Sequence, residues 1–167
     1  QYAGMSFVDF AHLKERNIKN GILDYNRQKT GTPMRLEILD TAELMRKELM
    51  GDKRPASGYL FPFLSGTKTG YEAYLEYNAA LSRFNRNLKA LKKAAGIASD
   101  VSSYRIRHSF AMALKEQNVP IEMISELLGH KSIKTTQIYL RSFSLEKMTE
   151  VNSTCFGCVY NYVSKVG

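Results

Sequence analysis

The chain has 167 residues, enough for one domain with a substantial hydrophobic core, and its apolar content of 44% is ordinary for a globular protein. It has no apolar run that could cross a membrane, no signal peptide at its start and only two cysteines, which argues against a disulfide scaffold and favours a cytoplasmic setting. The net charge of +8 favours a polyanionic partner, but this signal is weak alone because many soluble proteins are basic.

The first predicted elements are a helix and a β-hairpin. Apolar residues on one face predict a helix over residues 7–16. Apolar and polar residues alternate with a period of two over residues 34–38, which predicts a strand, and residues 22–27 are its predicted partner. Residues 29–32 form the predicted turn between them, because Gly and Thr favour a tight connection.

The middle of the chain is predicted to contain two helices separated by a loop. A short helix, capped by Asp40 or Thr41, should run to Met50. Residues 51–70 are rich in Gly, Pro and Ser and indicate a loop, whose apolar stretch YLFPFL is predicted to pack against the core. Apolar residues at steps of three and four predict a long helix over residues 71–95, packed against its own domain, with a coiled coil as the alternative.

Three further helices are predicted before the C-terminal tail. The first is capped by Ser102 or Ser103, the second begins at Pro120 and ends at Gly129, and the third begins near Ser132.

The tail contains a short predicted helix over residues 144–150 and an apolar segment over residues 155–163. We expect this segment to form a strand or helix docked on a protein surface, since its exposure would be costly; a frayed terminus is the alternative. Cys155 and Cys158 are interpreted as small apolar residues of the segment, with a metal or redox pair as the alternative.

The most informative stretch reads SSYRIRHSFAMALKEQNVPIEMISELLGHKSIKTTQIYL. It contains the pair Arg107-His108, then His130 after Leu-Gly, then Tyr139, which follows His130 by nine residues. These words occur together and in order, and they resemble the catalytic core of the tyrosine recombinases, also called the phage integrase family. The resemblance extends from the region of Ser6 to Tyr139.

The resemblance implies an α+β fold that is mainly helical, with a small antiparallel sheet. Residues 1–150 would form the catalytic domain, without its N-terminal edge, and residues 151–167 a tail that can dock on a neighbouring protomer. Because the chain does not begin with methionine, we expect it to be part of a longer protein whose missing part lies upstream.

The implied activity is site-specific recombination, in which DNA is cut and rejoined through a 3′-phosphotyrosine during integration or excision of a mobile element. The implied partners are double-stranded DNA, further copies in a tetramer on DNA, and accessory DNA-bending proteins, at the nucleoid in the cytoplasm. A tyrosine ester stores the energy of the broken bond, so neither a cofactor nor a metal is expected. The alternative is an accessory DNA-binding protein that keeps the fold but does not cut.

Four residues are candidates for this chemistry. Tyr139 is the candidate nucleophile, although its ordinary pKa of about 10 means that it needs help to ionise. Arg107 can bind two phosphate oxygens at once, and His130 can hydrogen-bond the phosphate or accept the tyrosine proton. The resemblance implies that Lys29, in the hairpin turn, protonates the leaving oxygen. The alternatives are a core tyrosine, a surface arginine, a helix-end histidine and a solvated lysine.

Two positions depart from the family pattern. Tyr104 stands where the family usually has a histidine or lysine, and Ser6 stands where it has its first arginine. A serine carries no positive charge, so either the site is inactivated or another residue, for instance Arg35 or Lys14, supplies the charge. The resemblance also implies that Asp9 helps to hold the active site.

His108 follows the candidate phosphate clamp directly in the sequence, so on a helix its side chain points elsewhere. We favour a buried structural role for it over a catalytic one.

Overall fold

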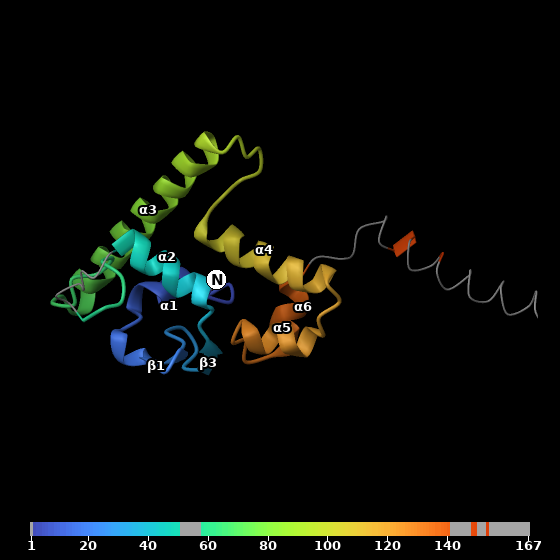
Figure 1. Cartoon of the computed structure of the whole chain (residues 1–167), viewed down its shortest axis with the longest axis horizontal. Helices are drawn as coiled ribbons and strands as arrows, with labels where there is room; N and C mark the ends of the chain where they lie inside the picture. The colour runs from blue at the N-terminus through green and yellow to red at the C-terminus, as the bar shows by residue number, and fades with distance from the viewer. Residues whose placement is uncertain (1, 51–57, 141–147, 150–152, 154–167) are drawn as a thin grey trace, which may run out of the picture.

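The computed structural model describes residues 2–50, 58–140, 148–149 and 153 (Figure 1), with only the backbone for residues 49, 50 and 139. The elements in chain order are α1 (Phe7–His12), the 3-10 helix η1 (Glu15–Asn17), β1 (Ile18–Lys19), β2 (Ile22–Asn26), β3 (Pro33–Glu37), α2 (Asp40–Met50), α3 (Gly70–Ala94), α4 (Ser103–Glu116), α5 (Ile121–Leu127) and α6 (Ile133–Tyr139). The predicted fold class is confirmed: a mainly helical chain with one small antiparallel sheet. In the described ranges, every helix is too short or too polar to span a membrane.

The sheet has the order β1-β2-β3 and is antiparallel throughout. Leu23 pairs with Leu36, and Tyr25 pairs with Met34, so the apolar side chains of the hairpin share one face. The hairpin turn closes through Gly31, whose positive φ of 67° suits glycine. The predicted hairpin is confirmed, whereas β1 was missed because two residues are too few to show alternation.

The first helix is shorter than predicted. α1 ends at His12, and Leu13 is already extended, with φ −60° and ψ 137°. The carbonyl of Leu13 accepts a hydrogen bond of 2.7 Å from the amide of Leu60, and Lys14 pairs with Tyr59. The helix over residues 7–16 was therefore wrong beyond His12, because pairing with a distant loop outweighed the local helical pattern.

The core consists of three clusters of buried side chains. The first lies around the sheet and comprises Leu13, Leu23, Tyr25, Met34, Leu60 and Phe61. The second lies around α1 and comprises Phe7, Ala11, Leu64 and Ala80. Phe10 and Phe63 pack against both clusters and connect them. The third lies in α4, α5 and the end of α6 and comprises Ala111, Ile124, Leu128 and Leu140. The prediction that YLFPFL packs on the core is confirmed, since it supplies three of these residues.

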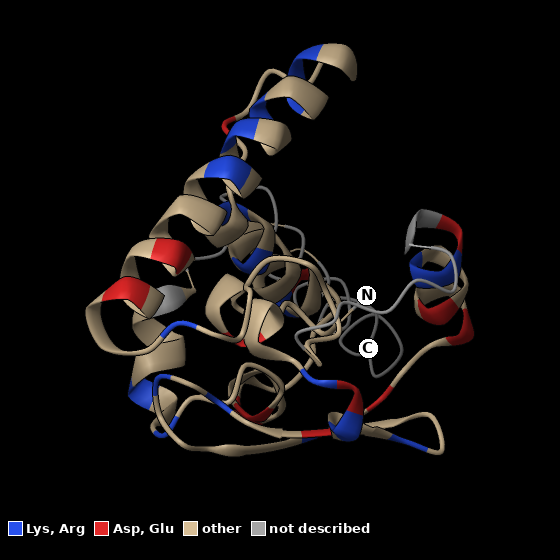
Figure 2. Cartoon of the chain, turned by 90° about the vertical axis from the view of Figure 1, so that its left-hand side faces the viewer, with Lys and Arg blue, Asp and Glu red and all other residues tan. Residues whose placement is uncertain are grey.

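The long helix α3 has nearly the predicted bounds, but only its middle packs against the domain. Ala80 is buried and the ring of Phe84 lies 4.8 Å from that of Phe7, between centroids. Leu91, in contrast, is 64% exposed. Figures 1 and 2 show that the far end of the helix projects from the body and carries repeated Lys and Arg positions. The helix therefore packs against its own domain, as predicted, but through its middle turns, and the apolar stripe beyond them is exposed.

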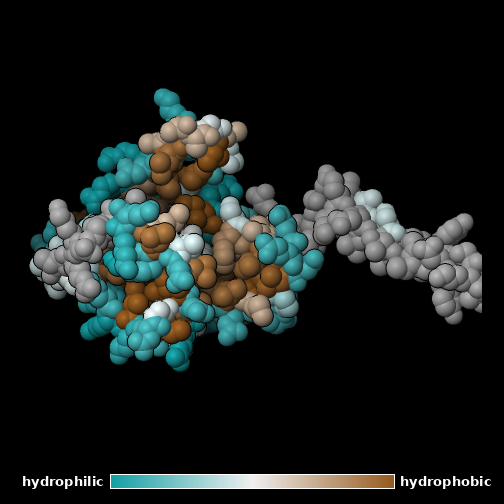
Figure 3. All heavy atoms as spheres, in the orientation of Figure 1, coloured by the Kyte–Doolittle hydropathy of each residue, from teal (hydrophilic) through white to brown (hydrophobic). Residues whose placement is uncertain are grey.

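The chain divides into an N-terminal part (residues 2–94) and a C-terminal part (residues 103–140), which lie side by side in Figure 1. Between them is an apolar pocket of about 260 Å³ that Phe7, Phe84, Ile106 and Phe110 help to line. Apolar side chains are also visible on the open surface of the molecule in Figure 3. The predictions for residues 144–150 and 155–163 fall almost entirely outside the described residues.

The third cluster generates a stability prediction. Replacement of Ile124, which is 1% exposed, by alanine should lower the free energy of unfolding by about 2–5 kcal/mol, because a cavity forms between α4 and α5. Ile138→Ala is the control, since Ile138 is 88% exposed and its loss should cost less than about 0.5 kcal/mol. Urea denaturation followed by circular dichroism measures both; equal losses would contradict the packing of α5.

Candidate active site

Arg107 is a buried arginine that joins the two parts of the chain. It lies in α4, which starts at the Ser102 cap, where the serine hydroxyl accepts a hydrogen bond from the amide of Arg105. Its side chain is 7% exposed; Nη1 donates to the carbonyl of Gly4 over 2.8 Å, and Nη2 to the carbonyl of Leu128 over 2.5 Å. These carbonyl oxygens fix the guanidinium in place but carry no formal charge of their own.

His130 directly follows the turn at the end of α5. Its Nδ1 shares a hydrogen bond of 2.9 Å with the hydroxyl of Thr136, a fully buried residue of α6, so the ring orientation is set from within the fold. Burial, together with the positive charges of Arg107, Arg27 and Lys29, lowers the pKa of His130 to about 4. At neutral pH the ring is therefore uncharged and able to accept a proton.

Lys29 and the backbone of Tyr139 lie on elements that border this region. Lys29 is exposed in the hairpin turn, and its charge acts on His130. Tyr139 is the last residue of α6, three residues after Thr136, the partner of His130. One helical turn thus separates the backbone of Tyr139 from the residue that orients His130. The side chain of Tyr139 is outside the described structure.

Two aromatic rings of α4, one turn apart and close to Arg107 in the sequence, stack on each other. The rings of Tyr104 and His108 are nearly parallel, at 8°, with centroids 6.4 Å apart. Tyr104 is 61% exposed, one turn before Arg107, and His108 is partly buried. Partial burial and stacking are compatible with the structural role expected for His108.

Asp9 and Ser6 form a polar cluster at the start of α1. Asp9 is 2% exposed. Its Oδ2 accepts hydrogen bonds from the hydroxyl of Ser6 over 2.5 Å and from Nε of Arg27 over 3.2 Å, and its Oδ1 accepts one from the amide of Gln28 over 2.7 Å. Ser6 thus acts as a neutral donor to a buried carboxylate, and Asp9 ties α1 to the base of the hairpin.

Arg27 is the residue that sequence reasoning missed. It is 7% exposed, forms the ion pair with Asp9, and donates from Nη1 to the carbonyl of Gly129 over 2.8 Å. One signal could have found it: Leu23, Tyr25 and Arg27 alternate along the buried face of β2 and its extension, so the arginine occupies an inward position.

The two cations considered from sequence as replacements lie elsewhere. The Nζ of Lys14 lies 5.1 Å from the centroid of the Tyr59 ring. Arg35 is exposed on β3, opposite Asp24. The cations that lower the pKa of His130 are instead Arg107, Arg27 and Lys29.

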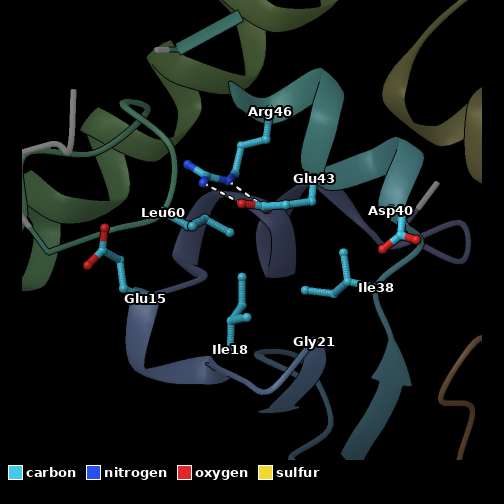
Figure 4. A pocket seen from close by; sticks show the side chains of 8 residues that line it. All are labelled: Glu15, Ile18, Gly21, Ile38, Asp40, Glu43, Arg46 and Leu60. Atoms are coloured by element: carbon cyan, nitrogen blue, oxygen red, sulfur yellow. Dashed lines mark hydrogen bonds and ion pairs between the residues drawn. The ribbon is translucent and has the colours of Figure 1, made fainter. Parts of the chain in front are cut away.

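A separate pocket has the wrong charge for a phosphate. It lies between η1, the β1–β2 turn and α2, and Figure 4 shows Glu15, Asp40 and Glu43 around it. Glu43 forms an ion pair of 2.6 Å with Arg46, which lowers the pKa of the Glu43 carboxyl. Three carboxylates against one guanidinium disfavour a polyanion here.

Gly129 generates a prediction about the joint between the two parts. Its φ is +61°, and a Cβ there would meet Cδ of Arg27 and Sδ of Met34. Arg27 is held at both ends by hydrogen bonds, so it cannot yield freely. We expect Gly129→Ala to lower the free energy of unfolding by about 2–4 kcal/mol, by backbone strain plus overpacking.

Gly21→Ala is the matched control for Gly129→Ala. Gly21 has a similar φ of +73° but open space around the added methyl, so it isolates the backbone strain, about 1 kcal/mol. Chemical denaturation of the two variants measures the difference; equal effects would show that Arg27 does not pack against Gly129.

His130 generates a pH prediction. Its folded pKa of about 4 lies below the ordinary value of 6.5, so protons bind preferentially to the unfolded chain. The stability associated with the neutral ring is present above pH 6.5 and is lost progressively as the pH falls toward 4. Titration of the His130 ring by NMR should give a midpoint near 4, and His130→Gln should flatten the pH dependence of stability in this window. A midpoint at 6.5 or higher would contradict the proposed environment.

Comparisons with known proteins agree with this arrangement of helices and sheet. The model of the phage integrase family matches residues 3–146. The tyrosine recombinase XerD of Lacticaseibacillus casei is 48% identical over 54 residues, which are 32% of this chain and 18% of that protein.

Solved structures extend the likeness over most of the chain. XerA recombinase matches with a TM-score of 0.66 and 23% identity, covering 92% of this chain and 54% of that one. The integrase of the Tn1549 transposon, in complex with a circular intermediate DNA, matches with a TM-score of 0.63 and 15% identity, covering 90% and 55%. The chain thus spans about half the length of these solved proteins, and the structural likeness shows the fold. Because the family model matches most of its residues, the chain belongs to the phage integrase family, the tyrosine recombinases.

Proposed function

We propose that this protein is a site-specific DNA recombinase and that its catalytic domain binds the scissile phosphate beside His130. The observation that carries the proposal is a concentration of positive charge at one place. Arg107, Arg27 and Lys29 all act on the neutral ring of His130, while the carboxylate of Asp9 balances one of these charges. A site with excess positive charge and partly buried walls favours a phosphate diester.

The proposed reaction is a transesterification. The hydroxyl oxygen of Tyr139 attacks phosphorus, the bond from phosphorus to the 5′ oxygen breaks, and a 3′-phosphotyrosine is formed. Arg107 neutralises charge on the non-bridging oxygens, and Lys29 gives the leaving 5′ oxygen its proton. His130, uncharged at neutral pH, hydrogen-bonds the phosphate or accepts the tyrosine proton. The phosphotyrosine conserves the bond energy, so these steps need neither a metal nor a cofactor.

Tyr104 and Ser6, the two departures from the family pattern, have proposed supporting roles, as does His108. The phenol of Tyr104, exposed one turn before Arg107, can donate a hydrogen bond to a phosphate oxygen but is a poor base at neutral pH. Ser6 orients the carboxylate of Asp9 instead of contributing charge. His108 stacks on Tyr104 and steadies it.

The setting of the reaction is also proposed. We infer that residues 1–150 form the catalytic domain of a longer recombinase, that residues 151–167 dock on a neighbouring protomer, and that the active assembly is a tetramer on double-stranded DNA, aided by DNA-bending proteins at the nucleoid. The likeness to the integrase of a transposon supports integration or excision of a mobile element as the biological role.

The alternative is an accessory protein that binds DNA without cutting it. The neutral Ser6, where the family has an arginine, is the observation that favours it. Only the enzyme forms a covalent adduct with DNA, so adduct formation separates the two functions.

Tyr139 provides the test. The full-length protein should form a covalent 3′-phosphotyrosine with a nicked suicide substrate, seen as a DNA-dependent shift on a denaturing gel. Tyr139→Phe should abolish this adduct because the nucleophile is lost. Tyr74→Phe is the control, since Tyr74 lies exposed on α3 and the change removes the same hydroxyl. An adduct of equal yield with Tyr139→Phe would refute the assignment, and DNA binding without any adduct would favour the accessory protein.

A further inference from the structure

We propose that Arg27 is the second phosphate-binding guanidinium of the active site and occupies the role that Ser6 cannot fill. The inference rests on the proposed recombinase function and deepens it. It assigns the missing positive charge to the base of the hairpin, a place different from both alternatives that the sequence raised, Lys14 and Arg35.

Arg27 and Arg107 bind the same turn of the backbone. Arg107 donates to the carbonyl of Leu128 over 2.5 Å, and Arg27 donates to the carbonyl of Gly129 over 2.8 Å. These are consecutive carbonyls of the turn that leads directly into His130. The two guanidinium groups are therefore neighbours on the same turn, although 80 residues separate them in the sequence.

Arg27 has hydrogen-bonding capacity that its contacts within the fold do not use. A guanidinium has five N–H donors in a planar fork. Nε is used by Asp9 and one donor of Nη1 by Gly129. Nη2 makes no hydrogen bond with the described residues, and it is not among the buried unsatisfied side-chain atoms of that part of the chain. A fork fixed on one edge and open on the other suits an oxygen of an incoming phosphate.

Ser6, Asp9 and Arg27 form one polar cluster. The Oδ2 atom of Asp9 accepts from both Ser6 and Arg27, so these two side chains meet at one oxygen. An arginine at position 6 would compete with Arg27 for the same carboxylate. The small serine leaves room for the guanidinium that comes from the hairpin, so a neutral residue at position 6 and a buried arginine at position 27 are complementary.

The electrostatics agree with a shared site. Arg27 and Arg107 both lower the pKa of His130, and both oppose the increase that burial and Asp9 cause in the pKa of Tyr25. Arg27 also lies two residues before Lys29, so its contacts with Asp9 and Gly129 hold the base of the turn that carries the proposed acid. One side chain thus binds the phosphate and positions the hairpin.

The main experiment removes the guanidinium at position 27 and introduces one at position 6. Arg27→Gln should slow covalent adduct formation on a suicide substrate by about 10²–10³-fold, the usual effect of removing one charge-stabilising donor. Affinity for the DNA itself should change less than about threefold, since most phosphate contacts remain. Ser6→Arg should not accelerate the parent. The double variant Ser6→Arg/Arg27→Gln should react at least about tenfold faster than Arg27→Gln alone, because it again places a guanidinium beside the carboxylate of Asp9.

Two further proteins keep the test decisive. Arg27→Lys retains the ion pair with Asp9 but loses the planar fork; it should fold even if Arg27→Gln does not, and it should still react at least about tenfold more slowly. Arg35→Gln is the matched control, because it removes an exposed arginine of the same hairpin and should leave the rate unchanged. Unfolding temperatures of all variants report folding independently.

A readout without chemistry separates this inference from the proposed function. In NMR titrations, Arg27→Gln should raise the pKa of His130, whereas Arg35→Gln should not. The shifts of the His130 resonances on addition of inorganic phosphate should give a dissociation constant at least about tenfold lower for the parent than for Arg27→Gln. A parent that binds phosphate through Arg27 but forms no adduct would refute the recombinase and leave this site standing. Full activity of Arg27→Gln, or an increase of orders of magnitude on Ser6→Arg alone, would overturn the role of Arg27.

Discussion

The architecture depends on two arginines that donate to consecutive carbonyls. Arg107 and Arg27 bind the carbonyls of Leu128 and Gly129, and through Gly4 and Asp9 they connect that turn to the N-terminal part of the chain. The two parts have separate buried clusters with an apolar pocket between them, and the hydrogen bonds from Arg107 to Gly4 and from Arg27 to Gly129 cross the joint. Hydrogen bonds from charged donors contribute about 1.5–3 kcal/mol each, and removal of one partner of a buried pair costs more.

This joint imposes a constraint on the turn before His130. Gly129 has a left-handed backbone, and the side chains of Arg27 and Met34 fill the space where a Cβ would lie. The glycine of the Leu-Gly-His motif is therefore required by packing, whatever the chemistry of the histidine that follows it. The glycine allows the sheet and α5 to approach closely, and that approach brings His130, Arg107 and the hairpin turn to one place.

The same arrangement concentrates positive charge at some cost to the free protein. Burial and three nearby cations keep the pKa of His130 low, and the buried carboxylate of Asp9 stabilises one of these cations. Self-repulsion of this kind is relieved when an anion binds, so charge that is unfavourable in the free protein becomes favourable in a phosphate complex. The acidic pocket around Glu43 lies apart from this site.

The sequence by itself determined the family, the hairpin, the bounds of the long helix and most candidate residues, because these depend on local periodicity and on motifs within short segments. It also indicated the departure at Ser6 but not its compensation. The early end of α1 and the exposure of the ends of α3 depended on packing partners distant in the sequence. The role of Arg27 was likewise decided by tertiary structure, since an arginine at an inward position becomes part of the site only when Asp9 and Gly129, which lie 18 residues before it and 102 residues after it, come within hydrogen-bond distance.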